Sequence, residues 1–261
     1  MRRCCRSRQL RQRAWDLWTP DSDRSVIRSG LYLDAARKMT VVSGAVSRWD
    51  DTDNKWAFTQ SNASLRPQYS ATGWNGSPAL NVTSTSQLLV GTANFTPLIN
   101  SSGFTVFASI NHTATGWFFE HGNATPGART GLAVISNQLY GVINGQVTIG
   151  NMSPSTNNIA VWRFDGSAST KSLLRLNGAD LVSGGITATA TTSNAGALNI
   201  GFGVDPNTFV GLMRDLIILP YAASDALIRK IEGFLYWKSG QLFRTPPARH
   251  PFKLRPPLVG D

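Results

Sequence analysis

The sequence predicts an all-β fold, an antiparallel sandwich or barrel with one helix near the C-terminal end. Three observations predict it. The 261 residues include 24 glycines and only 15% charged residues, which is typical of turn-rich β proteins rather than of helical bundles. About a dozen short apolar runs, separated by turn residues, fill residues 31–219. No long helical period precedes residue 224, and no change in composition divides residues 31–240, so we expect one domain.

The expected strands follow one another at short spacing. Residues 104–111 alternate between apolar and polar side chains, as in a half-buried strand, with Phe107 as the one apolar side chain on the second face. Asn144-Gly145 and Asn177-Gly178 are strong signals for two-residue hairpin turns. The other expected strands are residues 116–121, 131–136, 138–144, 146–150, 159–164, 172–176, 198–203 and 209–219.

Residues 224–240 carry the helical pattern. Ser224 is a suitable N-cap, Lys238 in the last turn complements the helix dipole, and Gly240 can end the helix. Four apolar side chains fall on one stripe that should pack on the sandwich: Leu227, Ile231, Phe234 and Leu235. Beyond the helix, several prolines should keep the C-terminal tail extended.

The net charge of +10 is concentrated at the two ends of the chain. Residues 1–13 hold six arginines and no acidic residue, and residues 238–261 hold five basic residues and one acidic residue. Residues 14–237 have equal numbers of basic and acidic residues, so the body is neutral. This distribution argues against a basic nucleic-acid groove across the fold. The N-terminal arginines are Arg2, Arg3, Arg6, Arg8, Arg11 and Arg13.

The N-terminal arm also contains both cysteines. Cys4 and Cys5 are adjacent, which suits neither a disulfide within the fold nor a four-ligand zinc site. Two readings stay open, a pair of free thiols or a disulfide to another chain. The basic start is not followed by an apolar segment, so we expect no secretory signal, and no apolar run is long enough to span a membrane.

Four segments carry a resemblance. Residues 31–35 read Leu-Tyr-Leu-Asp-Ala, residues 46–51 read Val-Ser-Arg-Trp-Asp-Asp, residues 231–238 read Ile-Glu-Gly-Phe-Leu-Tyr-Trp-Lys, and residues 250–252 read His-Pro-Phe. These segments resemble the concanavalin A-like (laminin G-like) jelly-roll module of bacteriophage and bacterial surface proteins, over roughly residues 31–257. The resemblance implies a two-sheet antiparallel jelly-roll sandwich whose first and last strands are neighbours, so that both basic tails leave from one side.

This comparison divides the chain into three parts. Residues 1–30 are a basic arm and linker, residues 31–240 are the jelly-roll domain including the helix, and residues 241–261 are a proline-rich basic tail.

Signs of catalytic chemistry are sparse. The chain has only two glutamates, Glu120 and Glu232, far apart in the sequence, and it lacks the clustered carboxylates of a glucanase on this fold. Glu120 and His121 could form an acid/base pair, but a polar strand end is the simpler interpretation. Motifs for nucleophilic hydrolysis, phosphate binding and metal binding are also missing. The sequence therefore predicts that the chain is not an enzyme and needs no cofactor.

Two weaker binding sites can be named. Asp50, Asp51 and Asp53 form an acidic cluster that could hold calcium, although the spacing of a defined calcium loop is missing and a solvated turn is the alternative. Aromatic rings stack on sugar rings, and three tryptophans in or near loops are candidates for glycan contacts: Trp56, Trp74 and Trp117.

The resemblance and the neutral body together predict a bacteriophage virion structural protein, displayed on the particle and made in the host cytoplasm. Its six arginines with Trp15 and Trp18 would anchor it to an acidic capsid or tail surface, in several copies or as a homo-oligomer. The alternative is a carbohydrate-binding adhesin for host surface polysaccharide. A third possibility, nucleic-acid binding by the arms, predicts a steep salt dependence.

Overall fold

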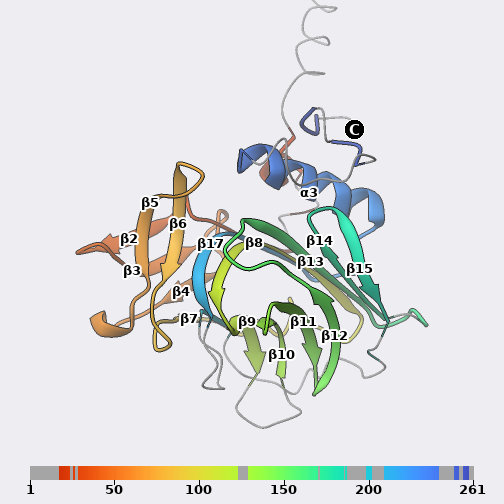
Figure 1. The fold of residues 1–261 in the computed structure, drawn as a ribbon, viewed down its shortest axis with the longest axis horizontal. Coiled ribbons are helices and arrows are strands. Elements are labelled where there is room, and N and C mark those ends of the chain that lie inside the picture. The colour runs from red at the N-terminus through yellow and green to blue at the C-terminus, as the bar shows by residue number, and fades with distance from the viewer. Residues whose placement is uncertain are drawn as a thin grey trace, which may run out of the picture.

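The strands and helices of the computed structural model confirm the all-β prediction (Figure 1). The structure describes residues 18–23, 26, 29–122, 129–169, 171–184, 186, 198–201, 209–240, 250–252 and 255–258. The first strands are β1 (Leu31–Asp34), β2 (Met39–Val42), β3 (Ala45–Asp50), β4 (Ala57–Thr59), β5 (Gln68–Trp74), β6 (Ser77–Val82), β7 (Leu89–Gly91), β8 (Gly103–Ala114) and β9 (Gly116–Gly122). They are followed by β10 (Arg129–Ile135), β11 (Gln138–Ile143), β12 (Gln146–Asn151), β13 (Asn158–Asp165), β14 (Ser172–Leu176), β15 (Ala179–Ser183), β16 (Leu198–Ile200) and β17 (Val210–Leu219). Short 3-10 helices are η1 (Pro20–Ser22) and η2 (Ala63–Leu65), and the α-helix is α3 (Asp225–Lys238).

The strands form two facing antiparallel layers. The first layer has the order β1, β17, β8, β13, β14 and β15, with β6 and β5 continuing beside the first half of β17. The second layer has the order β12, β11, β10, β9, β16, β7, β4, β3 and β2. The first strand, β1, pairs with the last, β17, which confirms the neighbourhood that the resemblance implied.

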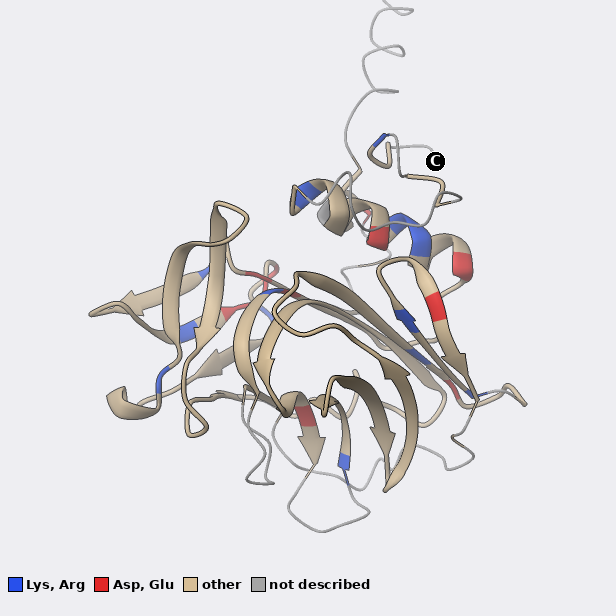
Figure 2. Cartoon of the chain, viewed as in Figure 1, with Lys and Arg blue, Asp and Glu red and all other residues tan. Residues whose placement is uncertain are grey.

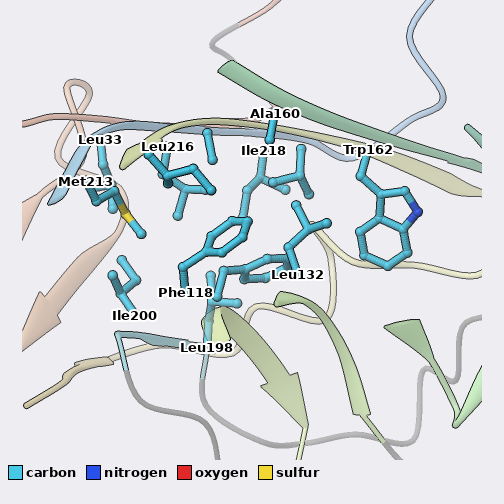
Figure 3. Close-up of a cluster of buried hydrophobic side chains, with 14 of the residues drawn as sticks. Leu33, Phe118, Leu132, Ala160, Trp162, Leu198, Ile200, Met213, Leu216 and Ile218 are labelled. Carbon is cyan, nitrogen blue, oxygen red and sulfur yellow. The ribbon is translucent and has the colours of Figure 1, made fainter. Parts of the chain in front are cut away.

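The main core lies between the two layers (Figure 3). Phe118 and Leu132 from the second layer face Leu216 and Ala160 from the first, and all four side chains are buried. Trp162 closes one side of this core, where its ring meets Phe104 edge-on with centroids 4.9 Å apart. Apolar burial of this kind is the main force that holds the layers together.

Strand β8 departs from the predicted half-buried pattern, because it is buried on both faces over most of its length. Phe104 and Val106 point into the main core, whereas Phe107 packs with the residues of α3 on the other face. The position of Phe107, the one apolar side chain on the predicted polar face of residues 104–111, thus has a structural reason. A helix covers that face of the sheet, so an apolar side chain is favoured there.

The two predicted hairpin turns are confirmed. Asn144 and Gly145 have φ values of 49° and 79°, and Asn177 and Gly178 have 53° and 79°. Two consecutive residues with positive φ are the signature of the type I′ turn, which Asn-Gly adopts with little strain. These turns join β11 to β12 and β14 to β15.

Helix α3 begins and ends as predicted. The Ser224 hydroxyl accepts a hydrogen bond from the Leu227 amide at 3.3 Å, and Gly240 follows the helix with a φ of 66°. The helix packs Ile231 and Leu235 against the outer face of the first layer, where Tyr32 also lies. Among the described residues, no helix is long and apolar enough to cross a membrane.

Both ends of the packed chain lie against α3. The Trp18 amide donates to the Pro257 carbonyl at 2.9 Å, and the Trp18 ring meets Phe234 edge-on at 6.2 Å. Trp18 has only 3% of its surface exposed, so it belongs to the packed unit and not to a free docking arm. Phe252 from the C-terminal segment also packs on the helix, over Gly233. The packed unit therefore extends beyond the expected boundaries at residues 31 and 240.

Candidate functional site

A cleft of about 970 Å³ lies at one end of the sandwich. It forms where the β5–β6 turn, the end of β8, the β12–β13 loop, the β14–β15 turn and Gly240, the second residue after α3, come together. Figure 1 shows the β5–β6 turn and α3 on the same side of the sandwich. The lining residues are Gly73, Asn75, Asn111, Asn151, Met152, Ser153, Ser155, Thr156, Asn157, Asn158, Leu176, Asn177 and Gly240.

A chain of three side-chain amides crosses this cleft. The amide nitrogen of Asn111 donates to the Asn157 oxygen at 2.8 Å, and the Asn157 nitrogen donates to the Asn75 oxygen at 3.0 Å. The Asn75 nitrogen in turn donates to the Ser239 carbonyl at 3.0 Å. Each amide nitrogen has a second N–H and each amide oxygen a second lone pair. The hydrogen bonds within the row therefore fix the orientation of the amides, and the remaining N–H groups and lone pairs can bond to a ligand.

A second set of hydrogen bonds fixes the wall of the cleft. The amide nitrogen of Asn177 donates to the Asn158 oxygen at 2.8 Å, and the Asn177 oxygen accepts from the Ile159 amide at 2.9 Å. Asn158 also donates to the Thr156 carbonyl at 2.8 Å, which ties the β12–β13 loop to β13. The Ser155 amide donates to the carbonyl of His112 at 2.8 Å. The wall is thus preorganised by side-chain amides and backbone groups.

The described lining of the cleft carries no charge. None of its lining residues is acidic, basic or histidine. In Figure 2 the charged segments of this region lie on α3 and on the strands β14 and β15 beneath it. A site with many uncharged donors and acceptors suits a ligand that carries hydroxyl groups and no net charge.

The three predicted tryptophans are not the stacking surface of this cleft. Trp74 lies in β5 beside Asn75, but none of its ring is exposed. Trp117 is 5% exposed and lies under the Arg129 guanidinium, 5.5 Å from its ring centre. Trp56 packs on Phe95 with ring centres 4.9 Å apart. Trp74 and Trp117 are buried and Trp56 packs partly buried against the main core, because large aromatic side chains gain more from burial than from exposure.

The three carboxylates of the predicted acidic cluster each contact other groups of the protein. Asp50 accepts hydrogen bonds from Arg48 Nε at 2.8 Å and from a terminal nitrogen of Arg48 at 2.6 Å, and Asp53 pairs with Lys55 at 3.0 Å. Asp51 is buried and accepts the backbone N–H groups of Asp53 and Lys55, both at 3.1 Å. Burial raises the Asp51 pKa, against the opposing effect of these hydrogen bonds. Within the described ranges, no three carboxylate, thiol or imidazole groups gather as metal ligands.

Glu120 and His121 are both buried and do not form an accessible acid/base pair. Glu120 has no exposed surface, and its Oε1 lies 3.7 Å from Arg129 Nε. His121 of β9 lies opposite Leu198 of the neighbouring strand β16, whose apolar residues belong to the main core. Desolvation lowers the His121 pKa to about 4, so its ring is neutral at pH 7.

The other predicted anchor residues lie outside the described residues. This applies to Cys4 and Cys5, to Trp15 and to the six arginines of residues 1–13. The cleft itself was missed by sequence reasoning. Asparagines are common in turns, and no local signal indicates that these turns meet.

Comparisons with solved structures show the fold. Domain 4 of AbnA, a GH43 extracellular arabinanase from Geobacillus stearothermophilus in complex with arabinotriose, is 16% identical with a TM-score of 0.54, over 70% of this chain and 92% of that one. Trypanosoma rangeli sialidase in complex with sialic acid is 15% identical with a TM-score of 0.54, over 89% of this chain. The chain spans only 37% of that sialidase. No protein-family model matches the sequence, and no curated protein matches it.

These comparisons correct one prediction. The sequence predicts that the chain is not an enzyme, but the structures with this fold include an arabinanase domain and sialidases. Excluding the enzyme class because motifs are missing was therefore wrong. At these identities the likeness shows the fold alone.

Proposed function

We propose that the chain binds uncharged carbohydrate in the cleft described above. The row of amides formed by Asn111, Asn157 and Asn75 carries this proposal. Sugar hydroxyls both donate and accept hydrogen bonds, and a row of fixed amides offers both partners at regular spacing. The similarity to a domain solved with arabinotriose and to sialidases supports a carbohydrate ligand over a purely structural role.

The size and chemistry of the cleft narrow the ligand class. Its volume of about 970 Å³ is at the upper end of the usual range for small-molecule sites and suits a short oligosaccharide. Met152 and Leu176 supply apolar contacts for the carbon face of a sugar ring. Among the described lining residues no cationic side chain is available to pair with a carboxylate, so sialylated or uronic acid glycans should bind more weakly than neutral ones.

Replacing Asn157 tests this function. We expect Asn157→Ala to weaken the binding of a neutral oligosaccharide by about tenfold to a hundredfold, because both neighbouring amides lose a partner and the ligand loses a contact. Isothermal titration with arabinotriose, and an array of other uncharged oligosaccharides, measures the effect. Sialyllactose serves as the anionic comparison.

A matched variant controls for general effects of losing an asparagine. Asn94 is exposed in a loop, is not among the described residues that line the cleft, and accepts a hydrogen bond from the Thr96 amide at 2.9 Å. Asn94→Ala should bind as the unmodified chain does. The proposal is contradicted if the folded chain binds no uncharged glycan on the array, or if Asn157→Ala binds with unchanged affinity.

A second function is favoured by the position of the chain ends. The hydrogen bond between Trp18 and Pro257 brings the two ends of the packed unit together at α3, and in the sequence the basic excess is concentrated in residues 1–13 and 238–261. We propose that these segments anchor the sandwich to an acidic protein surface of a virion, where it is displayed in many copies.

Deleting residues 1–17 tests the anchor. The deletion removes six arginines but keeps Trp18, which the fold needs. We expect incorporation into purified particles to fall at least tenfold while the unfolding transition stays unchanged. A variant with the six arginines changed to lysine keeps the charge and should be incorporated. Normal occupancy of the truncated chain would remove the anchor function.

A further inference from the structure

A buried ionic cluster lies where the end of α3 meets β1 and β17. Lys238 in the last turn of the helix places its Nζ against three groups. Nζ contacts the Asp34 carboxylate at 2.7 Å and the Tyr32 hydroxyl at 2.9 Å, and it also contacts Asp215 Oδ1. One amine is thus held between two carboxylates from two different strands.

The two carboxylates are direct neighbours in the sheet. Asp34 of β1 pairs with Asp215 of β17, and both lie on the face that α3 covers. Their side chains are 1% and 0% exposed, and the Lys238 side chain is 15% exposed. The rings of Tyr32 and Phe234 lie 5.2 and 5.9 Å from Nζ. The cluster is therefore largely shielded from water by protein.

The surroundings of the two carboxylates differ. Asp34 is held by other partners, because its Oδ1 accepts the Ala36 amide at 3.0 Å and its Oδ2 lies 3.2 Å from Arg37 Nε. Among the described residues neither Oδ2 atom accepts a hydrogen bond; Asp215 Oδ2 lies 3.7 Å from Arg214, and Asp215 Oδ1 accepts the Tyr32 hydroxyl at 3.5 Å. Apart from Lys238, the partners of Asp34 thus lie closer than those of Asp215. Asp215 has the carboxyl group less committed to other partners.

We propose that Lys238 and Asp215 join in an amide bond that forms after folding. Such a bond needs an amine against a carboxyl group, a second carboxylate within reach to carry protons, and a site that excludes water. Lys238 and Asp215 provide the amine and the carboxyl group, Asp34 provides the second carboxylate, and the buried interface between α3 and the first layer limits the access of water. Holding the reacting groups together supplies the high effective concentration that an uncatalysed condensation lacks.

The atoms balance without a cofactor. A proton passes from the ammonium of Lys238 to Asp215, which leaves an amine beside a carboxylic acid. The amine attacks Cγ of Asp215 and forms the N–C bond, while Asp34 takes a proton from the attacking nitrogen. Asp34 then returns that proton to the leaving hydroxyl, the C–O bond breaks and water departs. One amide and one water form, Asp34 is regenerated, and nothing is oxidised or reduced.

The bond would fasten the end of α3 to a central strand of the first layer. The two residues that follow α3 reach the cleft, because Gly240 lines it and the Ser239 carbonyl accepts a hydrogen bond from Asn75. A covalent link at Lys238 would therefore keep this edge of the cleft in place under heat, force or proteolysis. This inference does not depend on the nature of the ligand.

The intact mass of the purified chain tests the bond directly. We expect the folded chain to weigh less than its sequence by one water, and a protease digest to contain a peptide pair joined through Lys238 and Asp215. Lys238→Arg keeps the positive charge but cannot form this amide, so its mass should match its sequence. Glu232→Gln, which alters a different buried ion pair on the same helix, should keep the water loss.

The inference is overturned if the folded chain, after prolonged incubation, has the full mass of its sequence. It is also overturned if Lys238→Arg shows the same water loss. Asp34→Asn provides a further check on the mechanism, because this variant keeps both reacting residues, Lys238 and Asp215, but lacks the proton carrier. The bond should then form at least tenfold more slowly. An unchanged rate in that variant would exclude Asp34 as the positioning and proton-carrying group.

Discussion

Arg175→Ala should lower the free energy of unfolding by about 3–5 kcal/mol, because it leaves a buried carboxylate without its main partner. Arg175 of β14 donates from Nε to Glu232 Oε1 at 3.0 Å and from a terminal nitrogen to Oε2 at 3.1 Å. Glu232 of α3 has no exposed surface. The same guanidinium donates to the Gly178 carbonyl at 2.8 Å and pairs with Asp180. One side chain therefore joins the helix to the β14–β15 turn.

The double variant Arg175→Met with Glu232→Met separates two causes of instability. If the cost arises from an unpaired buried charge, removing both charges should restore most of the lost stability. If the cost arises from lost packing, the double variant should be as unstable as the single one. Urea unfolding monitored by tryptophan fluorescence measures all three proteins. A loss below about 1 kcal/mol for Arg175→Ala would contradict the structural role of this pair.

The same pair links stability to the cleft. Leu176 and Asn177 follow Arg175 directly and line the cleft. A variant that frees the β14–β15 turn should therefore weaken glycan binding as well as stability. We expect Arg175→Ala to lose more affinity than Asn94→Ala, even though Arg175 does not line the cleft.

Local sequence signals were sufficient to predict the turns, the helix and the general class of fold. Asn-Gly pairs at residues 144–145 and 177–178 predict type I′ turns because both residues tolerate positive φ, and the structure has it at both. Ser224 and Gly240 predict the ends of α3 for equally local reasons. These features depend on residues within one or two turns of each other. No long-range information is needed to find them.

The cleft could not be predicted in this way, because its parts meet only through the topology. Asn75, Asn111 and Asn157 each have a local explanation as a turn or strand-end residue, and 82 positions separate Asn75 from Asn157. The tryptophans mislead for the opposite reason. Their residue type predicts sugar stacking at Trp74, but this ring is buried in the apolar interior, where an aromatic ring is also favoured.

His121 should make the fold sensitive to acid, by about 3 kcal/mol between pH 7 and pH 4. Its pKa is lowered to about 4 in the folded chain because its ring is desolvated, against 6.5 for an ordinary histidine. The unfolded chain therefore takes up the proton first as the pH falls below 6.5. Stability is lost down to about pH 4, and the loss levels off below that value.

His121→Leu should remove this part of the acid sensitivity. The ring lies on the core side of β9, opposite Leu198, and its Nε2 has no hydrogen-bond partner among the described residues. An apolar side chain at this position should therefore cost little at pH 7. Burial also lowers the pKa of His112, so the variant should keep some dependence on pH. Chemical unfolding from pH 7 to pH 4 measures the difference, and parallel stability profiles for the two proteins would show that His121 is not the group that titrates.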